Sequence, residues 1–151
     1  MTKKLDIKIR AVAENDIALV AAMNKRLVED EGSRNPFADS QYRERMRGWL
    51  LNGDWELVLF IDSADTPLGY ATYRIEKDEY CQKREVVHLR QFFIDRRFRG
   101  CGYGRAAYAL LAAELFEHRE VKLDVLTTNP GGRQFWAKLG FAEYYVSMKK
   151  P

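Results

Sequence analysis

The sequence predicts an α+β fold, and the order of its hydrophobic patterns carries that prediction. Runs with apolar residues at every second position are typical of strands, and runs with helical spacing are typical of amphipathic helices. Along the chain these runs follow the order β-α-α-β-β-β-α-β-α-β. A length of 151 residues with 46% hydrophobic residues is enough for one domain with a buried core. We therefore expect a single domain over residues 1–151.

The first third of the chain is expected to hold one strand and two helices. Residues 5–11 alternate apolar and polar side chains, as a half-buried strand does. Capping side chains at Glu14-Asn15-Asp16 and at Asp39-Ser40 precede two stretches with helical spacing. Gly32 and Asn52-Gly53 are expected to end these two helices.

The rest of the chain is expected to hold five strands and two more helices. Enrichment in β-branched and aromatic residues favours the strands, and apolar stripes favour the helices. The expected strands span residues 55–61, 68–75, 86–94, 121–126 and 141–148, one helix contains residues 108–116, and the other spans 131–139.

A basic, glycine-rich turn separates the third strand of this run from the following helix. The stretch from Phe92 to Arg105 contains three glycines and four arginines. Glycines let successive N–H groups turn inward, and a helix N-terminus adds partial positive charge. This order of parts predicts a binding site for a ligand that carries phosphate.

Two common phosphate-binding motifs fit this turn poorly. A Walker loop needs Lys followed by Ser or Thr, whereas Gly104 is followed by Arg105 and Ala106. A dinucleotide-binding fingerprint needs Gly or Ala where Arg105 stands, and it belongs earlier in a chain. A simple tight turn is the remaining alternative. A helix with a clear apolar stripe follows at once, however, which a hairpin turn does not explain.

Two motifs in the same order resemble the GCN5-related N-acetyltransferases. Arg99-Gly100-Cys101-Gly102-Tyr103-Gly104 fits the family pattern Arg/Gln-x-x-Gly-x-Gly/Ala at the start of a helix. The stretch from Asn129 to Phe141 resembles a second family element, in which Asn, Phe-Tyr and Leu-Gly-Phe recur at this spacing. The resemblance covers almost the whole chain. It implies a central mixed, mostly antiparallel, twisted sheet of six to seven strands with about four helices.

The same resemblance implies acetyl-CoA as the cofactor, bound largely by backbone groups. In this family the strand before the turn carries a bulge and separates from its neighbour, and the pantetheine arm fills the gap. Backbone groups of Phe92 and Ile94 would pair with the pantetheine amides, and an N–H near Phe92 would polarise the thioester carbonyl. Arg99 and Arg105 would add charge near the phosphates. The expected cofactor-binding residues are Phe92, Phe93, Ile94, Arg99, Gly100, Cys101, Gly102, Tyr103, Gly104, Arg105, Asn129, Phe135 and Trp136.

Acetyl transfer to an amine by direct attack in a ternary complex needs the neutral amine. A lysine-like amine has a pKa near ~10.4, so only about one part in a thousand is neutral at pH 7.4. His88, on the strand that leads to the thioester, is the candidate general base. A histidine that only packs or forms hydrogen bonds is an equally weighted alternative. Many relatives use a Tyr as general acid where Trp136 stands here, so Tyr103, Tyr144, Tyr145 or water would protonate the thiolate.

Four residues are candidates for contact with the acceptor. In this fold the segment between the first two helices borders the acceptor site, so Glu29 and Glu31 would attract a cationic amine. Arg90 and Gln91 could contact an acceptor carboxylate. A solvated acidic helix end is the simpler alternative for the two glutamates. A small-molecule amine is the favoured acceptor, while a protein or peptide N-acetyltransferase and a non-catalytic acyl-CoA sensor remain alternatives.

Net charge, cysteine content and the lengths of apolar runs limit the partners and the cellular location that we expect. A net charge of +3 without a basic stripe argues against a nucleic-acid partner. Two cysteines cannot make a disulfide framework, which fits a reducing cytoplasm. Residues 1–6 lead into no apolar signal segment, and no apolar run approaches the ~18 residues needed for a membrane span. We expect a cytoplasmic protein that needs no metal. The sequence defines no oligomeric state, although a homodimer fits the resemblance.

Overall fold

Five strands form one sheet in the order β1-β2-β3-β4-β5 in the computed structural model, which describes residues 4–151. Neighbouring strands from β1 to β4 run antiparallel, and β5 runs parallel to β4. The sheet is therefore mixed and mostly antiparallel, as expected. The strands span Lys8–Ala11 (β1), Glu56–Ile61 (β2), Pro67–Lys77 (β3), Glu85–Ile94 (β4) and Val121–Lys122 (β5).

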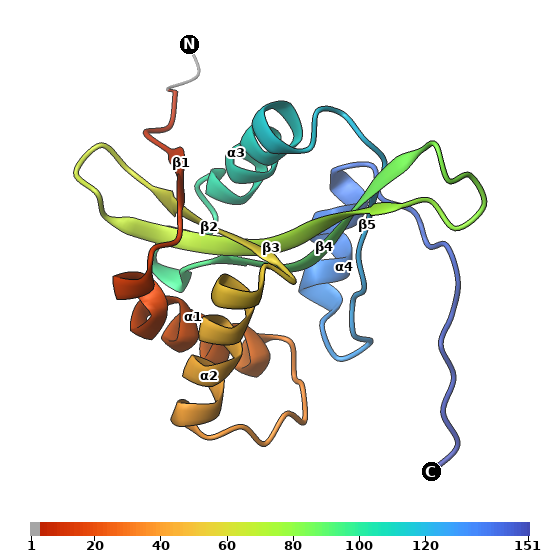
Figure 1. The fold of residues 1–151 in the computed structure, drawn as a ribbon, viewed down its shortest axis with the longest axis horizontal. Helices are drawn as coiled ribbons and strands as arrows, with labels where there is room; N and C mark the ends of the chain where they lie inside the picture. The colour runs from red at the N-terminus through yellow and green to blue at the C-terminus, as the bar shows by residue number, and fades with distance from the viewer. Residues whose placement is uncertain (1–3) are drawn as a thin grey trace.

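Helices cover both faces of the sheet. In Figure 1, α1 and α2 pack below it, α3 lies above it, and α4 lies beside the end where β4 and β5 meet. None of the helices within residues 4–151 is long and apolar enough to cross a membrane. The α-helices span Ile17–Asp30 (α1), Asp39–Asn52 (α2), Tyr103–Leu110 (α3) and Pro130–Lys138 (α4); shorter helical turns cover Glu14–Asp16 (η1), Arg96–Phe98 (η2) and Leu111–Leu115 (η3).

Because the sheet is covered twice, it contributes to two apolar cores. Strand β2 is buried at five consecutive positions, and its side chains point alternately into the two cores. The core under α1 and α2 includes Met23, Met46, Leu59 and Tyr70. The core under α3 includes Phe60, Val87, Leu89, Leu111 and Phe116. Strand β4 is thus held rigidly from both faces, which fixes the position of the turn that follows it.

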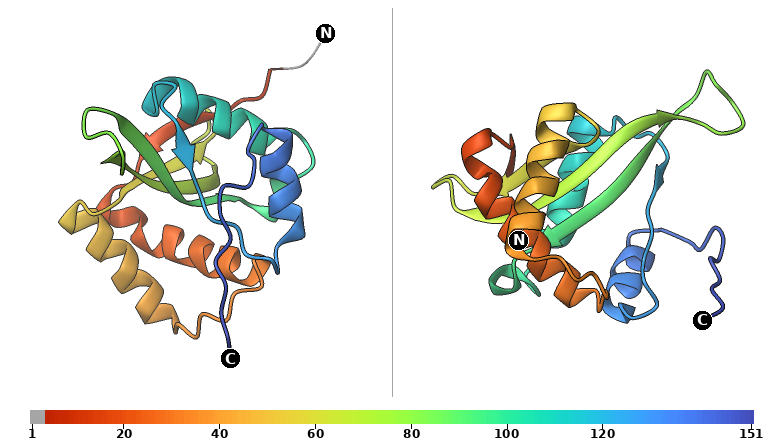
Figure 2. Two further views of the ribbon diagram at one scale, coloured as in Figure 1. Left: turned by 90° about the vertical axis from the view of Figure 1, so that its right-hand side faces the viewer. Right: turned by 60° about the horizontal axis from the view of Figure 1, so that its bottom comes forward.

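The prediction of a last strand at residues 141–148 is wrong. These residues have no regular secondary structure and run away from the sheet past α4 (Figure 2). The expected strand at 121–126 is also shorter, because only Val121 and Lys122 pair with β4. A strand needs a partner for its N–H and C=O groups, and a two-residue β5 offers almost no edge for another strand. The described sheet therefore has five strands, not six or seven.

Two further expectations need correction near the N-terminus. The first strand begins at Lys8 and not at residue 5. The second helix is capped one residue earlier than expected: Ala38 is the N-cap residue, and its N–H donates to Gln41 Oε1 at 2.7 Å. Asp39 instead pairs with Lys25 of α1 at 2.9 Å. The first helix begins after the expected residues Glu14–Asp16, which form η1.

Candidate functional site

A bulge in β4 opens a gap between β4 and β5. Arg90 has no partner in β3, because its two neighbours pair with consecutive β3 residues. Strand β5 pairs with β4 at Val87 and His88, and then the two strands diverge. A bulge bends its strand and increases the local twist. The expected bulge and the expected separation of the strands are both confirmed.

The gap forms a cleft with about 380 Å³ of unfilled space, including its open mouth. At one end Thr128 Oγ1 donates to the carbonyl oxygen of Glu31 at 2.6 Å, which ties the loop after β5 to the end of α1. The lining residues are Leu27, Glu31, Leu89, Arg90, Gln91, Phe92, Leu123, Asp124, Val125, Asn129 and Trp136.

The turn after β4 (residues 99–105, the glycine turn) has the geometry of an anion site. Gly100 and Gly102 have φ of +78° and +90°, a backbone region that residues other than glycine rarely adopt. Gly102 is the N-cap of α3 and supplies no side-chain cap. The N–H groups of Tyr103, Gly104 and Arg105 therefore have no intrahelical acceptor. Together with the helix dipole they can bind a phosphate group.

Gly104 serves packing in addition to its place in the turn. A Cβ on Gly104 would lie 3.0 Å from the Phe135 ring, so its absence lets α4 approach α3. Phe135 in turn stacks on Phe92, with ring centroids 5.8 Å apart. Trp136 packs edge-on against Phe92 at 5.2 Å and lines the cleft. Asn129 caps α4 by accepting a hydrogen bond from Gly132 N at 3.0 Å.

Arg99 is not free to neutralise a phosphate. Its Nη2 donates to Asp30 Oδ2 at 2.6 Å, and its Nε donates to the Ile94 carbonyl at 2.7 Å. Arg96 donates to the same Asp30 carboxylate. Burial opposes the ionisation of Asp30, but these hydrogen bonds outweigh it and hold its pKa below the usual value. Arg99 and Arg105 were both expected near the phosphates. Of these two, Arg105 is the one that has no carboxylate partner within residues 4–151.

Asp95 fixes the path of the chain from β4 into the glycine turn. Its side chain is 5% exposed. Oδ1 accepts from Arg97 N at 3.0 Å and caps η2, and Oδ2 accepts from Arg26 Nη1 of α1 at 2.8 Å. The basic residues 96, 97 and 99 therefore pair with internal carboxylates.

The three acidic residues at the end of α1 point to different places. Glu29 is 55% exposed and lies near Arg96, outside the cleft. Asp30 holds the two arginines of the turn. Glu31 lines the cleft, and its carboxylate has no hydrogen bond or ion pair within the described chain. Burial, with a smaller effect of Asp30, raises the pKa of Glu31. Of these two glutamates, the structure places Glu31 in the lining of the cleft and Glu29 outside it.

His88 lies next to the cleft but does not line it. Its ring packs edge-on against Trp55 at 5.1 Å. Nδ1 lies 3.9 Å from Glu76, and Nε2 lies 4.0 Å from Asp124, which does line the cleft. Burial lowers the pKa of His88, although Glu76 opposes the shift. The imidazole is therefore neutral at pH 7, as a general base must be.

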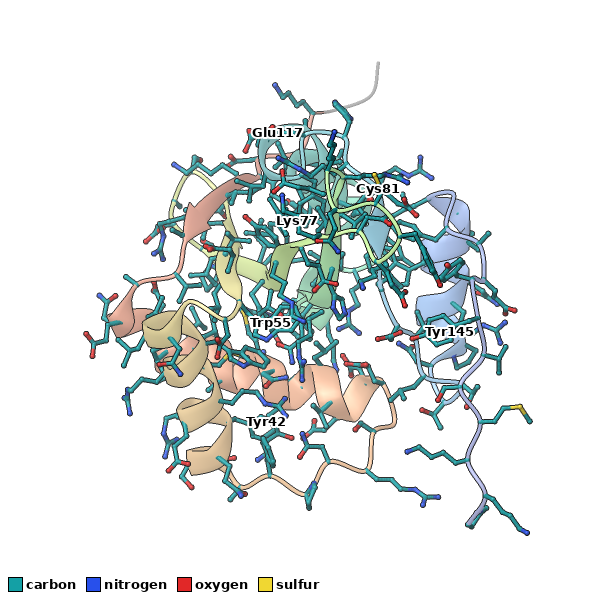
Figure 3. The ribbon with its side chains drawn as sticks, turned by 45° about the vertical axis from the view of Figure 1, so that its right-hand side comes forward. Tyr42, Trp55, Lys77, Cys81, Glu117 and Tyr145 are labelled. Carbon is teal, nitrogen blue, oxygen red and sulfur yellow. The ribbon has the colours of Figure 1, made fainter. Side chains whose placement is uncertain are left out.

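The candidate acids named from the sequence lie outside the cleft. Tyr144 and Tyr145 are 84% and 70% exposed on the C-terminal segment, where Figure 3 shows Tyr145 close to α4. Tyr103 packs edge-on against Phe98 at 5.8 Å. None of the three is among the residues that line the cleft.

Two polar residues near the cleft had no signal in the sequence. Tyr70 is fully buried in β3, and its hydroxyl donates to Gln91 Oε1 at 2.9 Å. Arg45 of α2 reaches the same region and donates to Asn24 Oδ1 at 3.5 Å. A tyrosine in an apolar strand is indistinguishable from core in sequence, and Arg45 stands among other charged residues of a helix. Only the packing of α2 on the sheet reveals them.

Comparison with known proteins agrees with this geometry. The model of the acetyltransferase (GNAT) family matches residues 22–141. An uncharacterised N-acetyltransferase of Methanocaldococcus jannaschii is 31% identical over 100 residues, which are 65% of this chain; the aligned region spans 44% of that relative's length.

Solved structures share the fold at lower identity. A possible acetyltransferase from Clostridium difficile 630 superposes with a TM-score of 0.78 at 16% identity and covers 97% of each chain. The crystal structure of a predicted acetyltransferase with acetyl-CoA from Clostridium acetobutylicum has a TM-score of 0.72 at 16% identity, covering 95% of this chain and 96% of that one. A ribosomal-protein-alanine N-acetyltransferase from Brucella melitensis biovar Abortus 2308 has a TM-score of 0.75 at 16% identity, covering 96% and 99%. With its family model spanning residues 22–141, and the bulged strand, glycine turn and helix in the expected order, the chain belongs to the GNAT acetyltransferase family.

Proposed function

We propose that this chain transfers the acetyl group of acetyl-CoA to a primary amine by direct attack in a ternary complex. The observation that carries the proposal is the cleft between β4 and β5, which is lined by β4 as far as Phe92 and by polar residues that include Glu31. The uncapped N-terminus of α3 follows β4 along the chain. Members of the family use acetyl-CoA, and one structural neighbour was solved with it. Donor and acceptor can thus enter one gap from different ends.

The proposed position of the coenzyme follows from the free backbone groups. The pyrophosphate binds the N–H groups at the start of α3, with Arg105 beside it. The pantetheine arm lies in the gap next to β4, against Phe92 and Trp136. Because the two strands diverge after His88, the gap offers unpaired backbone groups of β4 to the pantetheine amides. The thioester then lies near Arg90 and Gln91 at the bulge.

The proposed chemistry needs one proton acceptor on the amine side. The neutral amine attacks the thioester carbonyl carbon, the C–S bond breaks, and the nitrogen loses a proton. His88 accepts this proton through a water or through Asp124, which stands between its ring and the cleft. The coenzyme A thiolate leaves and takes a proton from water, since no tyrosine of the described chain lines the cleft.

A small acceptor suits the cleft better than a peptide. The hydrogen bond from Thr128 to the Glu31 carbonyl ties the loop after β5 to the end of α1 beside a lining residue, which limits the room for a long chain. The Brucella neighbour's name indicates a protein acceptor, and for this reason peptides belong in the test.

A cytoplasmic location of this chain stays a prediction.

A thiol-release assay with acetyl-CoA tests the function. We expect release of coenzyme A with at least one member of a panel of small amines and little release with peptides that have free N-termini. Calorimetric titration with acetyl-CoA runs in parallel. If acetyl-CoA binds and neither amines nor peptides release thiol, the chain is a sensor and not an enzyme.

A further inference from the structure

Two arginines beside the cleft have no carboxylate partner. Many arginines of this chain form ion pairs, for example Arg26 with Asp95 at 2.8 Å. Arg45 on α2 and Arg90 at the β4 bulge have no carboxylate oxygen within 4.0 Å anywhere in residues 4–151. Arg90 lines the cleft, and Arg45 lies behind it.

Aromatic rings hold both guanidinium groups in place. The Arg90 guanidinium carbon lies 5.1 Å from the Trp49 ring centroid and 5.0 Å from that of Trp55. The Arg45 guanidinium carbon lies 5.4 Å from the same Trp49 ring and 4.5 Å from the Phe37 ring. All four distances are within the range of cation–π interactions. Figure 3 shows Trp55 between the sheet and the α1–α2 layer, which is where these rings meet.

The two cations are held close together at a cost. Burial lowers the pKa of both Arg45 and Arg90, and the charge of Arg90 contributes to the shift at Arg45. Two like charges that share one partly desolvated site repel each other. A bound anion would offset this repulsion, so the two guanidinium groups are suited to a negative ligand group.

Other polar groups in the same place are also donors. The Gln91 carbonyl already accepts from the Tyr70 hydroxyl, which leaves its amide N–H groups for another acceptor. Asn24 Nδ2 and Thr72 Oγ1 are buried and have no hydrogen-bond partner within the described residues. Thr72 is the β3 residue paired with Gln91, and Asn24 Oδ1 accepts from Arg45. Buried polar groups normally have a hydrogen-bond partner, so Thr72 Oγ1 can bond to a further polar group, while Asn24 also interacts with the Tyr70 hydroxyl.

The opposite charge comes from Glu31 at the end of α1 and from Asp124, which also lines the cleft and whose charge acts on Arg90. Glu31 lines the same cleft and lacks a partner in the described chain. A carboxylate there attracts an ammonium group, whereas the two guanidinium groups attract an anion. We propose that the acceptor is a primary amine that also carries a carboxylate, as amino acids do, with its carboxylate at Arg90 and Arg45 and its amine facing Glu31. This substrate class rests on the proposed N-acetyltransferase function.

Matched acceptors test the proposal in the thiol-release assay. The panel pairs amino acids (α-amino acids, β-alanine and 4-aminobutyrate) with their amides, so that each pair differs in the carboxylate. At least one acid should have a kcat/KM about tenfold or more above that of its amide, mainly through KM. Arg90→Gln and Arg45→Gln should reduce this acid-to-amide ratio toward one. If each acid and its amide have equal kcat/KM in the wild-type protein, the proposal is overturned. An acid-to-amide ratio that is unchanged in both variants would also overturn it.

Controls separate this inference from folding and from the proposed function. Arg47→Gln, on the same helix and exposed, should leave the ratio unchanged, and thermal melting shows whether each variant is folded. Arg90→Lys keeps the charge and should keep part of the preference. If no amine yields thiol, the proposed function fails. Calorimetric binding of the acid and amide pairs to the protein with coenzyme A then still decides the inference, because equal or absent binding refutes it.

Discussion

Replacing Asp95 with alanine should destabilise the fold by about 2–3 kcal/mol, and replacing it with asparagine by about 1 kcal/mol. The side chain is 5% exposed and accepts one capping hydrogen bond, from Arg97 N at 3.0 Å. It also accepts two charge-assisted bonds, from Arg26 Nη1 at 2.8 Å and from Arg97 Nε at 3.2 Å. Each bond is worth about 1–2 kcal/mol here, because Arg26 is itself 43% exposed and partly screened. Asparagine keeps the cap and loses the charge.

Thermal unfolding followed by circular dichroism measures this effect. For a chain of this size, each 1 kcal/mol shifts Tm by about 2–4 °C. Alanine should therefore lower Tm by about 4–12 °C and asparagine by about 2–4 °C. Glu120→Ala is the matched control, because Glu120 pairs with Arg84 and both side chains are more than half exposed. Its effect should stay below about 1 kcal/mol. An alanine variant no less stable than this control would refute the reasoning.

The pH dependence of the same variants separates the charge from the hydrogen bond. Burial opposes the ionisation of Asp95, but the hydrogen bonds and charges of Arg97 and Arg26 outweigh it and lower its pKa. A carboxyl titrates near ~3.9 in the unfolded chain, so the stabilisation is complete above that pH and is lost as pH falls through the folded-state pKa. The stability difference between the wild type and Asp95→Asn should therefore shrink in acid. A constant difference from pH 7 to strongly acidic pH would contradict a charge effect.

Three further predictions concern the glycine turn and the candidate base. Gly102→Glu should abolish coenzyme A binding in calorimetry by placing a carboxylate at the phosphate site, whereas Gly53→Glu, also at positive φ, should retain it. Retained affinity in the former would exclude the phosphate site. Gly48→Ala, in open space on α2, should raise stability by about 0.5–1 kcal/mol, while Gly104→Ala should lower it because its Cβ meets a ring at 3.0 Å; equal gains would exclude that contact. His88→Ala should remove the acidic limb of kcat/KM, expected below pH ~6.5 because burial lowers its pKa. An unchanged pH profile would exclude His88 as the base.

Local pattern was enough for most elements of the fold. The β-branched and aromatic enrichment of β2 to β4 and the apolar stripes of α1 and α3 depend on which residues must be buried, and the local sequence records that directly. The final strand failed for a physical reason. Residues 141–148 have strand-like composition, but pairing depends on a neighbouring edge, and β5 provides only two residues. Composition cannot reveal whether such an edge exists.

The sequence by itself identified the motifs that are expected to bind the acetyl donor. The glycines at 100 and 102, the helix that follows and the second motif at 129–141 are local features, and they identify the family without any tertiary contact. Tertiary structure decided which charges are free. Asp30 binds Arg99, 69 positions away, and removes it from the phosphate side. Arg90 and Glu31 line one cleft, and Arg45 shares the Trp49 ring with Arg90, because α1, α2 and the β4 bulge pack together. Charges that are distant in sequence pair or stay unpaired only through packing, so the acceptor side could be read only from the folded chain.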